Sequence, residues 1–205
     1  MRYWGEGNAL CLVGAITLAL FAHSHHASAQ VFDWKPSHTT RFYDVSGQSG
    51  IEIYRDIGQK GPSVGIRRAI GLTEWDLKWQ RNYVPENDSC RLTAVRPFLA
   101  ITTTLPRSRS IRSTDLARKW ARFEKGIAVH EQGHSDRLYA VVDDIIARTS
   151  ELVVFDDPQC REIRAEVQRR VKAAFDRYQA DNTAYERREM SNGGNVQQLI
   201  LELVN

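Results

Sequence analysis

The sequence predicts an α+β fold, in which an antiparallel, β-rich amino-terminal half packs on a helical carboxyl-terminal half. Strand-like patterns rich in β-branched and aromatic residues fill residues 39–105, whereas apolar residues recur at helical spacing after Pro106. The helical part also carries the motif His130-Glu131-x-x-His134. No internal repeat or low-complexity linker divides the chain, so residues 30–205 are expected to form a single domain.

Residues 1–29 have the pattern of a secretory signal peptide. Arg2 supplies a positive start, residues 9–22 form an uncharged apolar run, and Ala27-Ser28-Ala29 is a small-residue cleavage signal. The apolar run is shorter than the roughly 20 residues that a membrane-spanning helix needs. We therefore expect cleavage after Ala29, export to the periplasm or the extracellular space, and no stable membrane anchor after cleavage.

The charge of the chain is close to balanced. Its formal net charge is only +3, and the basic residues are spread along the sequence. A nucleic-acid-binding or membrane-surface protein usually concentrates basic residues in a patch. We therefore expect no nucleic-acid partner.

Export would leave two of the three cysteines in the mature chain, because Cys11 lies in the signal peptide. In an oxidising compartment, the remaining pair, Cys90 and Cys160, is expected to form a disulfide. Closing a loop of about 70 residues would stabilise the fold by roughly 4 kcal/mol in the chain-entropy model. Two separate buried thiols are the alternative.

The first half of the mature chain is expected to consist of strands. Residues 42–45 and 51–54 are short runs rich in β-branched and aromatic side chains, with glycines between them. Trp75, Leu77 and Trp79 then alternate with charged residues, which indicates a strand with one buried and one wet face.

Residues 90–105 form another β-rich run, which ends at Pro106. Pro97 lies inside this run. Because proline cannot donate to a strand ladder, we expect either an edge position or two separate strands here.

The second half is expected to be helical. Ser113, Thr114 and Asp115 are potential caps of a long amphipathic helix, whose apolar stripe recurs at steps of three, four or seven. That stripe includes Leu116, Trp120, Phe123, Ile127, His134, Leu138, Val141 and Ile145. Asp156-Asp157-Pro158 breaks the helix, and a second charged helix is expected over residues 159–188. The apolar tail at residues 199–204 could dock as a short helix or strand.

The motif His130-Glu131-x-x-His134 predicts a metal site. Residues four apart lie on the same face of a helix, so both imidazoles can bind one ion. Glu131 is offset by about 100 degrees, so it can hold a metal-bound water without occupying the metal. His134 lies on the apolar stripe and His130 borders it, which places the site toward the interior. This is the geometry of zinc hydrolases of the HExxH type.

A third ligand is expected to be a carboxylate. Three of the other histidines lie in the signal peptide, and His38 lies in a polar segment near the mature terminus. Asp143 and Asp144 are two to three turns from His134 on the same helix, which is too far to share an ion. The other acidic candidates are Glu151, Asp156, Asp157, Glu162, Glu166, Asp181, Glu186 and Glu189. A residue from the next helix or from the segment after it is the physically easier choice.

Several motifs follow one another along the chain in a characteristic order: Tyr43-x-Val45-x-Gly47, Gly61-Pro62, Thr73-x-Trp75-x-Leu77-x-Trp79, Cys90, Leu105-Pro106, Trp120, His130-Glu131-x-x-His134 and Cys160. In this order they resemble a bacterial family, the domain of unknown function 922 family. Members of this family are described as predicted secreted zinc-dependent proteases. The resemblance therefore implies a zincin-like metallopeptidase domain with a zinc ion, Zn2+, as its cofactor.

The sequence departs from the family near its carboxyl end, where members carry a Tyr-Asp pair and then His-Gly. Here Tyr185 is followed by Glu186, and the histidine has no counterpart. If the acidic residue is the third ligand, Glu186 takes its place with a longer reach. If it is the histidine, the site is incomplete. Tyr185 could bind the oxyanion of a tetrahedral intermediate, or it could simply pack.

Three functions are compatible with these features. The first is a secreted or periplasmic zinc metallopeptidase that acts on a peptide or protein substrate, with His130, His134 and Glu186 as metal ligands and Glu131 as the general base. The second is a non-catalytic zinc-binding module of the cell envelope. The third is an exported scaffold without a metal.

Overall fold

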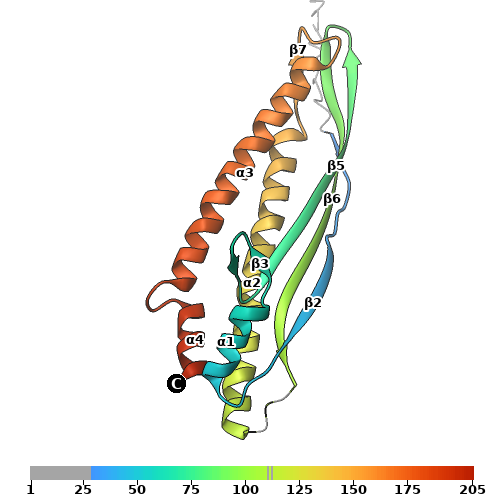
Figure 1. The fold of residues 1–205 in the computed structure, drawn as a ribbon. Coiled ribbons are helices and arrows are strands. Elements are labelled where there is room, and N and C mark those ends of the chain that lie inside the picture. The colour runs from blue at the N-terminus through green and yellow to red at the C-terminus, as the bar shows by residue number, and fades with distance from the viewer. Residues whose placement is uncertain (1–28, 110, 112) are drawn as a thin grey trace, which may run out of the picture.

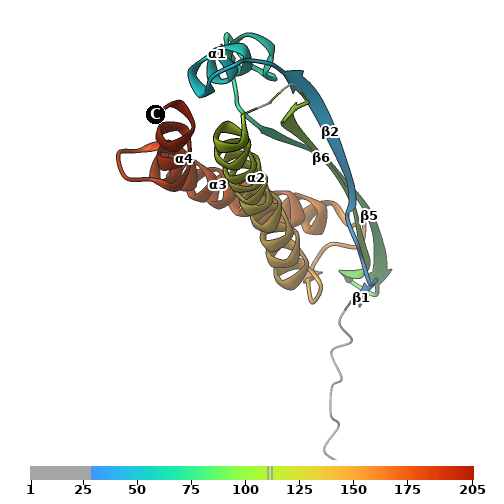
Figure 2. The ribbon, with the colours of Figure 1, turned by 90° about the horizontal axis from the view of Figure 1, so that it is seen from below.

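The computed structural model describes residues 29–109, 111 and 113–205. A long, curved sheet runs along one side of the molecule, and the helices pack against one face of it (Figures 1 and 2). The predicted α+β class is confirmed. The predicted signal peptide lies, apart from Ala29, outside the described residues. Within the described part, no helix is long and apolar enough to cross a membrane.

The sheet is built around one long central strand, β6 (Ser89–Ser108). Strand β5 (Leu72–Glu86) pairs antiparallel along one side of β6. The other side pairs in turn with β7 (Val153–Phe155), β1 (Gln30–Val31) and β2 (Ser37–Val45).

The prediction of an antiparallel sheet is confirmed for β5 and β7 but is wrong for β1 and β2, which run parallel to β6. A parallel pair needs a long crossover connection. Helix α1, a small hairpin and β5 all lie between β2 and β6 in the chain and provide that connection. The sheet is therefore mixed.

Strand β6 is continuous through Pro97, so the alternative of two separate strands is wrong, whereas the alternative of an edge position is confirmed for Pro97 itself. The partner strands explain why proline is tolerated. On one side, pairing with β1 ends at Val95 and pairing with β2 starts at Ala100, so Pro97 lies opposite a gap. The strand also runs past Pro106 to Ser108.

A β-bulge at Thr93 changes which residues of β6 face the helices. The register with β5 shifts there, since Asn82 pairs with Ala94 but Tyr83 pairs with Leu92. An extra residue in one strand reverses the alternation of inward and outward side chains. On β5, the predicted alternation is confirmed, and its tryptophans face the helices, with Trp75 stacked on Phe175 of α3 at 5.4 Å.

The predicted strand at residues 51–54 is wrong, because these residues begin helix α1 (Gly50–Lys60). The side chain of Ser49 accepts a hydrogen bond from the backbone N–H of Glu52, and Glu52 Oε2 accepts one from Gln48 N at 2.6 Å. Such reciprocal caps favour helix initiation. Ile53 and Ile57 lie one turn apart and are both buried.

The hairpin of β3 (Ser63–Val64) and β4 (Arg67–Arg68) follows α1. It leads directly into β5 (Figure 1), and the segment between them contacts the middle of α2, where Gly71 lies against Glu131.

The predicted long helix is confirmed as α2 (Thr114–Thr149), and the Ser113 side chain accepts a hydrogen bond from the N–H of Leu116. The second predicted helix is α3 (Arg161–Met190), and the tail forms helix α4 (Asn195–Val204). The Asp157 carboxylate accepts hydrogen bonds from the first turn of α3, and so acts as its cap.

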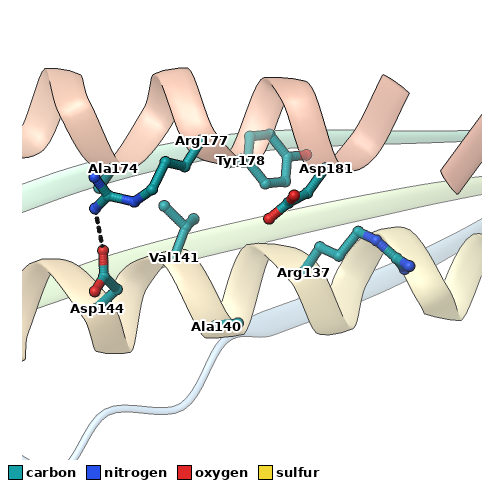
Figure 3. A pocket seen from close by; sticks show the side chains of 8 residues that line it. All are labelled: Arg137, Ala140, Val141, Asp144, Ala174, Arg177, Tyr178 and Asp181. Atoms are coloured by element: carbon teal, nitrogen blue, oxygen red, sulfur yellow. Dashed lines mark hydrogen bonds and ion pairs between the residues drawn. The ribbon is translucent and has the colours of Figure 1, made fainter. Parts of the chain in front are cut away.

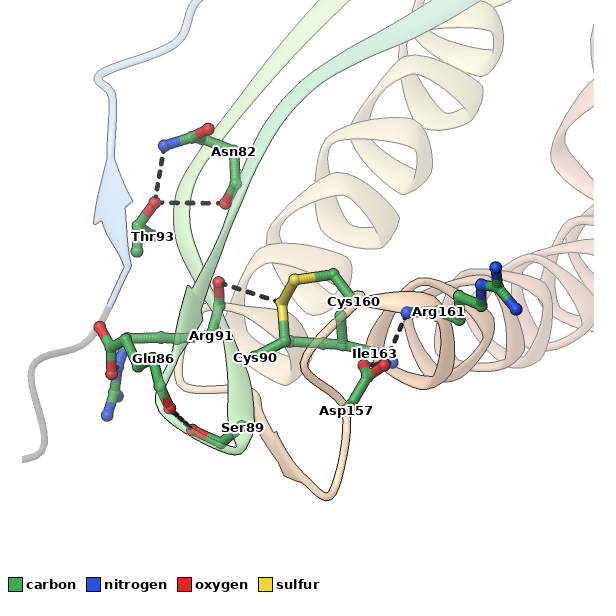
Figure 4. Close-up of a disulfide and its surroundings, with 10 residues drawn as sticks. All are labelled: Asn82, Glu86, Ser89, Cys90, Arg91, Thr93, Asp157, Cys160, Arg161 and Ile163. Carbon is green, nitrogen blue, oxygen red and sulfur yellow. Dashed lines mark hydrogen bonds and ion pairs between the residues drawn. A yellow bond between two sulfur atoms is a disulfide. The ribbon is translucent and has the colours of Figure 1, made fainter.

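The predicted disulfide between Cys90 and Cys160 is present and joins the start of β6 to the start of α3 (Figure 4). It belongs to one of the two main core clusters, to which α2 contributes Leu138 and Val142. The other cluster receives Phe123 and Ile127 from α2. The histidine motif therefore lies on the stretch of α2 between the two cores, where packing on both sides holds the helix in place.

Candidate metal centre

Three side chains from two helices meet at the middle of α2. His130 and His134 lie one turn apart on α2, and Glu186 reaches them from α3. The Nε2 atoms of the two histidines are 3.1 Å apart. Glu186 Oε1 lies 3.1 Å from Nε2 of His134 and 3.5 Å from Nε2 of His130. Among the described residues, this is the one group of three His, Cys, Asp or Glu side chains spaced to hold a metal ion.

The spacing of these atoms fits a tetrahedral ion. Zinc bonds to imidazole nitrogen and carboxylate oxygen are about 2.0–2.1 Å long, so two ligand atoms of a tetrahedral site lie about 3.3 Å apart. The separations of 3.1, 3.1 and 3.5 Å scatter around this value. Two nitrogens and one oxygen form a donor set typical of zinc, and three protein ligands leave one coordination position for water or substrate. The residues therefore fit the metal that the motif predicts.

The ring of His134 is oriented by Asn182 of α3. Nδ1 of His134 lies 2.7 Å from the side-chain oxygen of Asn182, which can only accept a hydrogen bond. Nδ1 must therefore carry the proton, so in the neutral ring the lone pair of Nε2 is directed at the group. His130 is less restrained, because the nearest acidic atom to its Nδ1 is Glu189 Oε2 at 3.8 Å.

Glu131 lies beside the three possible ligands but is not one of them. Thr73 of β5 donates a hydrogen bond to its Oε2 at 2.7 Å. The main chain at Gly71 packs closely against the same carboxylate, because a Cβ atom added there would lie only 2.5 Å from Oε1 of Glu131. Burial raises the pKa of Glu131, and the hydrogen bond from Thr73 opposes this rise. A buried, oriented carboxylate with a raised pKa is suited to proton transfer.

Tyr185 packs against the histidines. Its ring stacks on His130 at 5.0 Å, and its hydroxyl donates to the main-chain oxygen of His130 at 3.1 Å. Arg137 covers the ring, with its guanidinium 3.7 Å from the ring centre. A Cβ at Gly133 would overlap the hydroxyl group. These contacts favour the packing interpretation of Tyr185 over an oxyanion-binding one.

A pocket of about 180 Å³ opens beside the group and is lined by His130, Glu131 and Glu186. The segment from Arg68 to Gly71, which joins β4 to β5, forms another part of its wall. The site is thus accessible from a cavity.

Comparison with known proteins agrees with the resemblance seen in the sequence. Residues 40–194 match the family described as "Bacterial protein of unknown function (DUF922)". This chain belongs to the DUF922 family. No curated protein and no solved structure matches it.

In this DUF922 protein, the predicted site residues His130, Glu131, His134 and Glu186 lie together. Of the acidic candidates, Glu186 is the one within the group. His38 lies elsewhere, on β2, where its Nε2 is 2.9 Å from Thr103 Oγ1.

Two residues that orient the site, Asn182 and Thr73, were not predicted from the sequence. Asn182, Tyr185, Glu186 and Glu189 are spaced at i, i+3, i+4 and i+7, which places them on one face of α3. This spacing could have linked Asn182 to the predicted ligand Glu186. Nothing in the sequence pattern links Thr73 to Glu131, because their contact depends on how β5 crosses α2.

The three groups of this DUF922 protein also stabilise one another electrostatically. Hydrogen bonds with His130 and His134 lower the pKa of Glu186 to about 2, despite the opposing effect of burial. Burial alone would lower the pKa of His134, but its hydrogen bonds with Glu186 and Asn182 outweigh burial and raise that pKa.

These shifts predict a pH window for the stability that Glu186 contributes. A carboxyl group with a lowered pKa contributes stability above its unfolded value of 4.5, and this contribution is lost as the pH falls toward 2. The raised pKa of His134 gives a contribution that is complete below 6.5 and is lost as the pH rises through the raised value. In chelator, the loss of unfolding free energy in Glu186→Gln should therefore be largest between pH 4.5 and 6.5.

Denaturant titrations at several pH values measure this loss. Glu74→Gln, on the exposed face of β5, is the control and should show no such window. A loss in Glu186→Gln that is the same at every pH would contradict the ionic coupling.

A second pocket lies between α2 and α3, one to three turns from the histidines (Figure 3). The ion pair of Arg177 with Asp144, at 2.6 Å, crosses it. Arg137 borders this pocket and also covers Tyr185. None of the possible metal ligands lines it, so the candidate site is the pocket beside Glu131.

Proposed function

We propose that this DUF922 protein is a zinc-dependent peptidase that hydrolyses peptide bonds in peptide or protein substrates. The observation that carries the proposal is the group of His130, His134 and Glu186, with separations that fit a tetrahedral ion and with the carboxylate of Glu131 beside it. An ion with three protein ligands and one open position is typical of catalytic zinc sites, whereas structural sites are closed by four ligands.

His130, His134 and Glu186 would hold the zinc ion. When bound, zinc supplies Lewis acidity, which lowers the pKa of a coordinated water to about 7 and polarises the carbonyl group of the substrate. Asn182 keeps the ring of His134 in the tautomer that binds metal. Tyr185 holds α3 against α2, and so keeps Glu186 in reach of the histidines.

Glu131 would act as the general base and then as the general acid. It accepts a proton from the attacking water as the oxygen of that water bonds to the carbonyl carbon. It then gives this proton to the leaving nitrogen as the carbon–nitrogen bond breaks. Thr73 holds one oxygen of Glu131 by its hydrogen bond, which limits the carboxylate to a position facing the pocket.

We further propose that the protein is exported to the periplasm or the extracellular space. The amino-terminal sequence has the features of a signal peptide, and the disulfide between Cys90 and Cys160 is of the kind that persists in oxidising compartments.

Metal analysis and peptide hydrolysis test the function together. Protein secreted from a host and purified without a histidine tag should contain one zinc per chain by elemental analysis. It should cleave members of a peptide library, lose that activity in a chelator and regain it when zinc is added. Zinc without hydrolysis would instead support the non-catalytic envelope module, and protein that binds no zinc would overturn both.

A further inference from the structure

The pocket beside Glu131 has a polar wall and an apolar floor. Ile127 and Val196 are almost fully buried and form the floor. Tyr54 and Ile70 are half-buried and pack against the same core cluster. Met190 at the end of α3 is 47% exposed and stands at the rim. The cavity therefore extends from the metal ligands to an apolar lining, and burying an apolar group against this lining is favourable.

The size of this cavity suits one side chain. Its volume is about 180 Å³. Pockets for drug-sized molecules start near 300 Å³, whereas an apolar cavity of about 150 Å³ can hold a benzene ring. A leucine, methionine or phenylalanine side chain is thus within its capacity.

The charges around the pocket disfavour a basic side chain. Its two carboxylates, Glu131 and Glu186, are engaged by Thr73 and by the histidines. Among the residues that the structure describes, Arg68 is the one Lys or Arg that lines it, and it is exposed at the mouth. With zinc bound, the two positive charges of the ion would offset these two carboxylates. A lysine or arginine of the substrate would then lose hydration there without meeting a net negative charge, and Arg68 would repel it.

The wall of the pocket is formed before any substrate binds. The hydroxyl of Tyr43 donates to the main-chain oxygen of Ile70 at 2.6 Å. The N–H of Ala69 donates to Pro62 O, and Arg68 Nη1 donates to Gly61 O, both at 2.9 Å. These bonds fix the segment between the hairpin and β5, so binding does not have to order it.

We propose that this pocket is a specificity pocket, which receives an apolar side chain of a residue that flanks the cleaved bond. The proposal rests on the proposed peptidase function, because it assigns a substrate class to the same site. It predicts preference for leucine, methionine or phenylalanine at one flanking position, and rejection of lysine and arginine there.

Cleavage profiling is the first test. A library of peptides randomised on both sides of the cleaved bond is digested, and the products are sequenced by mass spectrometry. At one flanking position, kcat/KM for leucine should exceed that for glycine or lysine at least about tenfold, since a single methylene in an apolar pocket is worth about that much. Cleavage without a preference for apolar residues would overturn the pocket assignment and leave the peptidase function standing.

Changing the wall should change the preference. Ile70→Ala enlarges the pocket and should raise the ratio of phenylalanine to leucine cleavage about tenfold. Val64→Ala is the matched control, because Val64 is exposed on the hairpin that precedes Ile70 and does not line the pocket. If Ile70→Ala fails to fold, Met190→Ala at the exposed rim replaces it. A ratio that neither variant changes would contradict the assignment.

A binding test does not depend on turnover. Hydroxamates of glycine, leucine, phenylalanine and lysine are titrated calorimetrically into zinc-loaded Glu131→Gln protein. The leucine and phenylalanine compounds should bind at least about tenfold more tightly than the other two, and Ile70→Ala should reduce this difference for leucine. If the parent protein cleaves no peptide yet shows this order, the catalytic proposal fails and the pocket stands. Equal binding of all four compounds would overturn the pocket.

Discussion

Replacing Glu131 by glutamine is expected to lower kcat for peptide hydrolysis by about 10²–10⁴-fold, the usual contribution of a general base. Glutamine has nearly the same shape and can keep the contact with Thr73, but it cannot accept a proton from water. His130, His134 and Glu186 are unchanged, so the variant should still bind one zinc. Steady-state kinetics and elemental analysis of the same preparation measure the two effects separately.

Asp136→Asn is the control for this variant. Asp136 lies on the exposed side of α2, about one turn beyond Glu131. Its substitution removes the same charge from the same helix. Its kinetics should match those of the parent protein. If Glu131→Gln hydrolysed peptides as fast as the parent, Glu131 would not be the base. If it lost zinc as well as activity, its role would be structural.

The disulfide is expected to have the largest effect on stability. The chain between Cys90 and Cys160 forms a loop of 70 residues, for which the chain-entropy model gives about 4 kcal/mol. The double variant Cys90→Ala/Cys160→Ala should therefore unfold at a Tm lower by roughly 8–16 °C, the shift expected for a protein of this size. Alanine avoids leaving polar groups in a position where both cysteines are buried.

The site should tolerate this loss at temperatures where the double variant remains folded. Glu186 lies about 40 Å along α3 from Cys160, so zinc stoichiometry and kcat should stay those of the parent. A reductant is the control: it should lower the Tm of the parent and leave that of the double variant unchanged. A parent Tm that does not respond to reductant, together with a double variant of equal Tm, would show that the disulfide adds no stability.

Local patterns in the sequence were sufficient for much of the fold. The period of three and four along α2 and α3 depends only on which residues are apolar, and both helices form as predicted. The predicted strand at residues 51–54 is a helix because of a local signal in the sequence. Ser49 and Glu52 have the spacing of a capping box, which outweighs the β propensity of isoleucine.

Features that depend on distant partners could not be predicted. Whether Pro97 interrupts a strand depends on which strands lie beside it, and the gap between β1 and β2 is set by pairing far away in the sequence. The parallel direction of β2 is also a property of the whole topology. The short strand β7 was missed because three residues carry too little periodicity to be recognised.

The candidate site was predictable to the extent that it is encoded in one helix. His130, Glu131 and His134 are brought together by a single turn of α2, and that geometry follows from their spacing. Glu186 depends on how α3 packs on α2, and only the family resemblance singled it out from the other acidic residues. The apolar pocket joins α1, the hairpin, α2, α3 and α4, so no single segment of the sequence reveals it.

Two of the three possible ligand atoms belong to α2 and the third to α3, so a bound ion would clasp the two helices together. Any protein or small molecule that pulls the end of α3 away from α2 must then weaken ion binding. By thermodynamic reciprocity, the ion must weaken the binding of that molecule by the same factor. The dissociation constant of the ion, measured by titration, would thus report how far α3 is separated from α2.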